Sequence, residues 1–103
     1  MKLPTLGIVI SLLALSLFAH EGSHAQDTRG RDLATTCSGC HGTSGRSASG
    51  MPNIAGLDQA YITKQMNDFK SGARPATVMH QIAKGFSDEQ IVLLATYFSA
   101  QKN

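Results

Sequence analysis

Apolar residues recur at helical spacing in the segment from Asp58 to Ser71. The residues that would share one face of this helix are Tyr61, Ile62, Met66 and Phe69. Asp58 suits the N-cap, where a carboxylate can accept a backbone N–H, and Gly72 follows where a glycine often ends a helix. The segment is therefore predicted to form an amphipathic helix.

The segment from Asp88 to Gln101 has the clearest helical pattern in the chain. Spacings of three, four and seven residues relate Ile91 to Leu94, Ala95 and Phe98. Ser87 and Gln90 fit a capping box, in which each side chain accepts a backbone N–H of the other residue. The pattern predicts a second amphipathic helix with one apolar face in the core.

Two shorter helices are predicted from weaker patterns. The first runs from Asp27 to about Thr36, and Gly30 within it suggests close packing of another helix. The second runs from Pro75 to Lys84, because proline suits a first helical turn, and its apolar side would carry Val78, Met79 and Ile82. Gly42–Gly56 is rich in glycine and serine and is predicted to be a loop. No strand is predicted, so the fold class is all-α, with about four short helices.

The first residues are typical of a secretory signal peptide. Lys2 and the terminal amine supply a positive start, and the uncharged run Leu6–Ala19 is too short to cross a membrane. Small residues in Ser23-His24-Ala25 suit cleavage before Gln26. We therefore expect a signal peptide over residues 1–25 and export to the periplasm; the alternative is an uncleaved membrane anchor.

Residues 26–103 would then form a single small domain. Eight Lys and Arg against six Asp and Glu leave a net charge of +2, which is too weak to indicate nucleic acid or a membrane surface as a partner. A core of this size is marginal by itself and usually needs a disulfide, a metal or a prosthetic group.

The pentapeptide Cys37-Ser38-Gly39-Cys40-His41 supplies the candidate chemistry. Two thiols three positions apart, followed by an imidazole, are typical of covalent c-type haem attachment. Each thiol would add to one haem vinyl group, and His41 would bind the iron. A dithiol redox motif would need a βαβ context, and a structural zinc site would need a fourth ligand. A simple disulfide is the remaining alternative.

The second axial ligand decides what the iron does, since methionine or histidine closes it and an empty position permits gas binding or catalysis. Met66 lies in an apolar stripe and suits core packing. Met51 could reach around the ring from His41. Met79 is favoured because it lies on the apolar side of its helix. His80 points about 100° away, beside polar neighbours that suit a solvated histidine. Spacing alone leaves Met51 and His80 open.

The chain from Gln26 to Lys102 resembles a small class I bacterial cytochrome c, and within that class the haem subunits of flavocytochrome c sulfide dehydrogenases. The segments that carry the resemblance are 37–43, 69–72, 78–79, 82–87 and 95–98. The resemblance implies one covalent haem c on Cys37 and Cys40, with His41 and Met79 as axial ligands. It also implies that the Pro52 carbonyl accepts a hydrogen bond from His41.

The resemblance further implies a periplasmic carrier of single electrons that accepts them from a sulfide-oxidising flavoprotein and has no catalysis of its own. Asn53–Leu57 is closer to shuttle cytochromes and their diheme relatives, so a free shuttle between respiratory complexes is the first alternative. A five-coordinate haem enzyme or gas sensor is the second. A basic docking surface, or simply the solvated faces of two helices, would carry Lys64, Lys70, Arg74 and Lys84.

Overall fold

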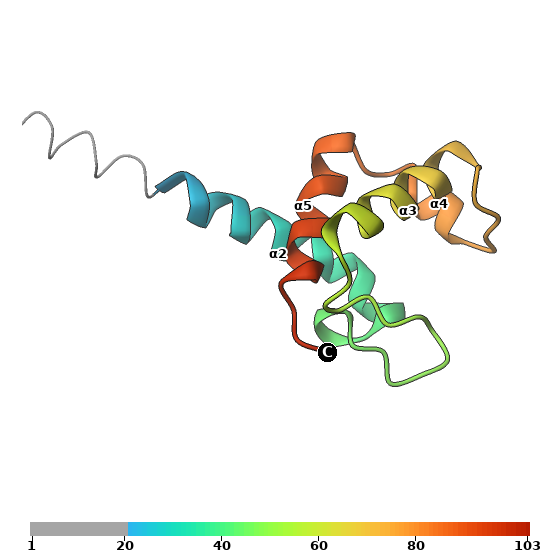
Figure 1. The fold of residues 1–103 in the computed structure, drawn as a ribbon, viewed down its shortest axis with the longest axis horizontal. Helices are drawn as coiled ribbons and strands as arrows, with labels where there is room; N and C mark the ends of the chain where they lie inside the picture. The colour runs from blue at the N-terminus through green and yellow to red at the C-terminus, as the bar shows by residue number, and fades with distance from the viewer. Residues whose placement is uncertain (1–20) are drawn as a thin grey trace, which may run out of the picture.

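The part of the chain that the structure describes, residues 21–103, folds into helices without strands. The computed structural model has the element order α2 (Glu21–His41), 3-10 turn η1 (Thr43–Gly45), α3 (Gln59–Ser71), α4 (Met79–Ala83) and α5 (Asp88–Ser99) (Figure 1). The all-α prediction is confirmed. Most of the predicted signal peptide lies outside the described residues.

Helix α5 forms the centre of the domain and packs against both α2 and α3 (Figure 1). Its buried side chains are the four that the sequence pattern selected: Ile91, Leu94, Ala95 and Phe98. The capping box is present, since Gln90 N donates to Ser87 Oγ at 3.1 Å and Ser87 N donates to Gln90 Oε1 at 2.9 Å. The helix ends at Ser99, two residues before the predicted end.

Helix α2 crosses α5 at Gly30, where the two backbones come close together. A Cβ on Gly30 would lie 2.9 Å from the Leu93 carbonyl oxygen and 3.4 Å from Tyr97 Cβ. This is tighter than side-chain atoms tolerate, so a residue without a Cβ permits the crossing. The close packing expected at Gly30 is therefore observed.

Helix α2 is longer than predicted at both ends: it begins at Glu21 instead of Asp27, and it continues through the cysteine motif to His41 instead of ending near Thr36. Ser38 and Gly39 are poor helix formers, which is why the sequence pattern stopped short. A backbone bond from Gly42 N to Ser38 O, 3.1 Å long, and the burial of the His41 side chain hold the last turn. No helix in residues 21–103 has the length and apolar composition needed to span a membrane.

Helix α3 has the predicted bounds and caps. Tyr61 N donates to Asp58 Oδ2 at 3.1 Å, and Gly72 ends the helix with φ 83°. Ile62 and Met66 are buried as expected. Tyr61 is 49% exposed, so its predicted place on the packed face is wrong.

Helix α4 begins at Met79, four residues after the predicted start at Pro75. Proline fits a turn as well as a first helical turn, so its presence does not distinguish the two. The chain before Met79 is instead held by contacts to α3, as with the bond from Arg74 N to Asp68 O at 3.1 Å. Val78 and Ile82 are exposed, so only Met79 of the predicted apolar side packs on the core.

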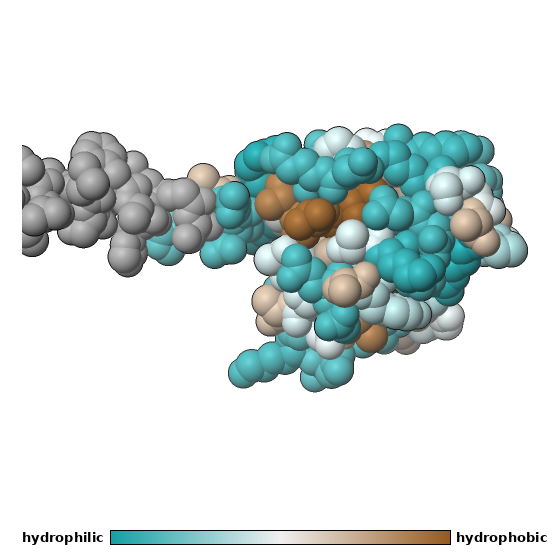
Figure 2. All heavy atoms as spheres, turned by 45° about the horizontal axis from the view of Figure 1, so that its top comes forward, coloured by the Kyte–Doolittle hydropathy of each residue, from teal (hydrophilic) through white to brown (hydrophobic). Residues whose placement is uncertain are grey.

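The face of the domain that Figure 2 draws is largely hydrophilic. Figure 2 shows one group of hydrophobic side chains near the place where α2 enters the domain. A groove lies between α2 and α5 in this region, and its lining includes Gly30, Arg31, Val92 and Leu93. It involves the first half of α2, whereas the cysteine motif occupies the last turns of that helix.

Candidate cofactor site

The last two turns of α2 present the candidate ligands of the motif. Cys37, Cys40 and His41 stand at positions i, i+3 and i+4 of this helix, so they share one side of it. Cys37 is partly buried, Cys40 is exposed, and His41 is 9% exposed. The continuation of α2 through the motif therefore aligns two thiols and an imidazole.

One ring nitrogen of His41 is bound by the backbone of the following loop. His41 Nδ1 lies 2.7 Å from the Pro52 carbonyl oxygen. A carbonyl oxygen can only accept, so Nδ1 donates, and a neutral imidazole then keeps the lone pair of Nε2 for a metal. The contact that the resemblance implied is present in the structure.

Backbone hydrogen bonds hold the loop that brings Pro52 to His41. Ile54 N and Ala55 N both donate to Gly45 O, at 2.9 and 3.2 Å. Gly42, directly after His41, has φ 82°, and a Cβ there would lie 2.0 Å from Arg46 O. Sequence reasoning missed the importance of Gly42; its position between the motif and a glycine-rich loop was the one available signal.

The environment of Cys37 favours its neutral thiol. Burial raises the pKa of the Cys37 thiol, and a neighbouring Cys40 thiolate raises it further. A weak hydrogen bond with the Thr36 hydroxyl, 3.9 Å from Sγ, acts in the opposite direction. Before any attachment, Cys37 is therefore protonated at neutral pH, and Cys40 is the more accessible thiol.

The three methionines of the described region differ in their surroundings. Met66 is 8% exposed and belongs to the core, as expected for a residue in the apolar stripe of α3. Met51 is 37% exposed in the loop after η1. Met79 is partly buried, begins α4 and packs against the edge of the core. A buried thioether already enclosed by the core is poorly placed to become a ligand, which leaves Met79 and Met51 as sulfur candidates.

His80 is less exposed than a solvated histidine would be. Its ring is partly buried, and Nδ1 is shielded from water without a hydrogen-bond partner among the described residues. The expectation of a solvated His80 is therefore wrong. The imidazole remains a rival nitrogen ligand next to Met79.

The comparison with known proteins decides the family. Residues 28–102 match the family described as Cytochrome c. The chain belongs to the cytochrome c family. It is an electron carrier, and its cofactor is covalently bound haem c.

Three relatives show the range of this similarity. This cytochrome is 47% identical over 72 residues to the "Cytochrome subunit of sulfide dehydrogenase" of Chlorobaculum tepidum, a match that covers 70% of this chain and 66% of that protein. It is 36% identical over 100 residues to the "Thiosulfate dehydrogenase electron acceptor" of Stutzerimonas stutzeri, covering 94% of this chain and 46% of that protein.

The third relative is a solved structure. Crystalline reduced recombinant cytochrome c4 from Pseudomonas stutzeri superposes with a TM-score of 0.68 and 27% identity, covering 76% of this chain and 49% of that chain. The predicted class I cytochrome c fold is confirmed. The cytochrome spans about half the length of two of these relatives and 66% of the other.

The residues of this cytochrome fit haem c. Two thiols on one helical face can reach one edge of a ring, and His41 has one nitrogen free for iron. Met79 carries a thioether, and the apolar side chains of Val78 and Ile82 beside it are exposed and could line a porphyrin. The donor set and the apolar surroundings are those that a c-type haem needs.

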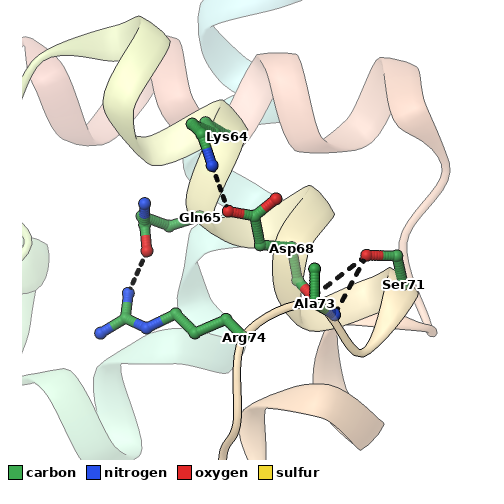
Figure 3. A network of polar contacts seen from close by, with 6 residues as sticks. All are labelled: Lys64, Gln65, Asp68, Ser71, Ala73 and Arg74. Atoms are coloured by element: carbon green, nitrogen blue, oxygen red, sulfur yellow. Dashed lines mark hydrogen bonds and ion pairs between the residues drawn. The ribbon is translucent and has the colours of Figure 1, made fainter.

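Most of the basic residues considered for docking are engaged within the domain. Lys64 pairs with Asp68, and the Arg74 guanidinium donates to Gln65 Oε1 (Figure 3). Lys70 donates to the Phe86 carbonyl oxygen at 2.7 Å and pairs with Asp88 at 3.2 Å. Because these three cations have partners within the domain, they are less available to bind another protein, and the hypothesis of a basic docking surface is weaker.

Proposed function

We propose that this cytochrome is a periplasmic carrier of single electrons and the haem subunit of a sulfide-oxidising flavoprotein complex. The 47% identity to a cytochrome subunit of sulfide dehydrogenase carries the choice of partner. The buried His41, held by the Pro52 carbonyl, supports the electron-transfer role, because a fixed axial ligand moves little when the iron changes its oxidation state.

We assign the site residues as follows. Cys37 and Cys40 would hold a c-type haem through thioethers, and His41 Nε2 and the Met79 thioether would bind its iron. Pro52 fixes the His41 ring through its carbonyl. When bound, haem c supplies an iron that accepts and releases one electron. With His41 and Met79 both bound to the iron, the chain would offer no open position for a substrate.

Sulfide-dependent reduction tests the partner directly. The holo-cytochrome is mixed with sulfide alone, with the candidate flavoprotein alone, and with both, while the haem spectrum is followed. We expect rapid reduction only with both and copurification of the two proteins. Reduction that is equally slow with and without the flavoprotein would contradict the subunit assignment.

A free electron shuttle is the second candidate function. The 36% identity to a thiosulfate dehydrogenase electron acceptor, over 94% of this chain, favours it. A shuttle would run as a monomer, would be reduced by a thiosulfate dehydrogenase, and would be indifferent to the flavoprotein. These three readouts separate the subunit from the shuttle.

Export is part of this proposal. Cleavage after Ala25 would leave Gln26 as the first residue of the mature protein, in a compartment suited to c-type cytochromes. N-terminal sequencing of the protein from a periplasmic extract tests it. A protein that starts at Met1 and remains with the membrane fraction would favour the uncleaved anchor.

A further inference from the structure

The segment that carries Met79 lies between α3 and α5 and includes little regular structure. We call residues 72–87 the Met79 segment. It leaves α3 at Gly72, forms the five-residue α4 against α3, and enters α5 at Asp88. A helix this short is not stable by itself, so contacts with the rest of the domain must hold the segment in position.

The N-terminal end of the Met79 segment is fixed to α3 through Arg74. Arg74 N donates to Asp68 O at 3.1 Å, and its guanidinium carbon lies 4.7 Å from the centroid of the Phe69 ring. The same guanidinium donates to Gln65 Oε1 (Figure 3). All of these partners lie on α3, so they hold the chain only where it leaves that helix.

The C-terminal end of the segment is fixed to α3 through Lys70. Lys70 Nζ donates to Phe86 O at 2.7 Å and lies 3.2 Å from Asp88 Oδ1. The Lys70 side chain is 31% exposed, whereas that of Asp88 is 89% exposed. The partly shielded bond to the Phe86 carbonyl is therefore the stronger of the two, because solvent weakens an exposed ion pair.

We propose that Lys70 is a positioning residue for Met79, because its ammonium closes the Met79 segment onto α3 at the Phe86 carbonyl. This inference rests on the proposed function, in which Met79 is an axial ligand. Without the ammonium, the C-terminal end of the segment keeps the packing of Ala83 and Phe86 on the core and the Ser87 cap, but it loses its polar link to α3. The thioether of Met79 then leaves the iron more often, although the core around α5 is unchanged.

Lys64 provides a matched control for Lys70. Both lysines are on α3, but Lys64 pairs with Asp68 one turn along the same helix and makes no link to the Met79 segment. The substitutions Lys70→Met and Lys64→Met each remove one ammonium and keep a long apolar side chain. A difference between the two variants therefore reports the link to Phe86 and not the loss of a charge.

The experiment uses ferric holoprotein and measures how fast added imidazole displaces the methionine, followed by loss of the sulfur-to-iron charge-transfer band. Opening of the segment limits this rate when imidazole is in excess. We expect Lys70→Met to be about tenfold faster than wild type, from the strength of a charged hydrogen bond, and Lys64→Met to stay within about twofold. Lys70→Arg, which keeps a donor, should restore most of the slow rate.

Guanidinium unfolding of the same variants separates positioning from general stability. Loss of the Phe86 bond lowers the unfolding midpoint of Lys70→Met as well, so Gly30→Ala, destabilised at the α2–α5 crossing away from the Met79 segment, is the reference. A faster imidazole rate in Lys70→Met than in Gly30→Ala at a comparable midpoint supports the proposal. Equal imidazole rates in Lys70→Met and Lys64→Met, or in Lys70→Met and Gly30→Ala at a comparable midpoint, would overturn it. If Lys70→Met gives no folded holoprotein, Lys70→Gln replaces it with the same expected direction.

The same band distinguishes this inference from the proposed function. If Met79→Ala loses the band while Lys70→Met behaves like Lys64→Met, the positioning role is wrong and the axial assignment stands. If Met79→Ala keeps the band, both are wrong.

Discussion

At the scale of single residues, one side of one helix and one backbone carbonyl determine the proposed haem site. Cys37, Cys40 and His41 are aligned because α2 continues to the end of the motif. The Pro52 carbonyl, 2.7 Å from His41 Nδ1, orients the imidazole. The fold thus orients in advance the two thiols and the imidazole that we propose attach and ligate haem.

The two thiols can be tested one at a time. We expect wild-type protein to carry one haem mass in denaturing mass spectrometry, because a thioether survives unfolding. Cys37→Ala and Cys40→Ala should each keep the haem through the remaining thioether. The double variant Cys37→Ala/Cys40→Ala should release it. A haem mass that stays on the double variant would contradict attachment at these positions.

At the scale of elements, the crossing of α2 and α5 sets the position of the motif. The crossing depends on Gly30, where an added Cβ would meet the Leu93 carbonyl oxygen at 2.9 Å. The cysteine motif lies farther along the same helix. A change at the crossing therefore alters stability without touching a haem ligand.

Gly30→Ala tests the crossing. We expect a loss of about 1–3 kcal/mol in the free energy of unfolding, because the two helices must move apart. Gly50→Ala is the control, since a Cβ at Gly50 would meet nothing within 4 Å. Chemical denaturation of the holoproteins measures both. Equal stability of the two variants would show that the crossing tolerates a methyl group.

Ser87→Ala tests the start of α5. Its hydroxyl accepts Gln90 N at 3.1 Å, so we expect a loss of about 1 kcal/mol in the free energy of unfolding. Ser49→Ala is the control, because the exposed Ser49 hydroxyl caps no helix. The midpoints of guanidinium unfolding compare the two. An unchanged midpoint in Ser87→Ala would mean that packing, without the Ser87 cap, determines where α5 begins.

The sequence pattern predicts the helices that are specified by their own periodicity and caps. Helix α5 follows from its periodicity and its capping box, and α3 from Asp58 and Gly72. The pattern does not predict the helical turn through Ser38 and Gly39, because these poor helix formers are held by the bond from Gly42 N to Ser38 O and by the buried His41 that follows them.

Contacts with another helix also explain why α4 starts later than predicted. Pro75 permits a helix, but Arg74 ties the preceding backbone to α3. At the site, the spacing of the motif predicts Cys37, Cys40 and His41, and the resemblance adds Met79 and Pro52. Only the folded chain reveals that His80 is partly buried and that Lys70 donates a hydrogen bond to the Phe86 carbonyl.

At the scale of the whole molecule, the domain has a small apolar core. In the described region the two large side chains that are fully buried are Ile91 and Leu94. A core of this size supplies little net stability, so a bound haem that packs against Met79 and its neighbours would contribute a substantial part.

Removal of the cofactor tests this dependence. We expect the haem-free chain at 25 °C to lose most of its helical circular dichroism and its cooperative melting, because the core alone barely offsets the entropy of folding. Holoprotein in the same buffer is the reference. A haem-free chain that melts at the same temperature as the holoprotein would show that the core suffices.

The central claim is that the chain supplies two ligands to the iron, as an electron carrier needs, and leaves no open position. The identity of the second ligand tests this claim most directly. The measurement is the ferric absorption spectrum of Met79→Ala, compared with Met51→Leu, Met66→Leu and His80→Ala. We predict that Met79→Ala alone loses the sulfur-to-iron charge-transfer band and that its ferrous form binds carbon monoxide readily. A Met79→Ala spectrum that keeps the band would contradict the account.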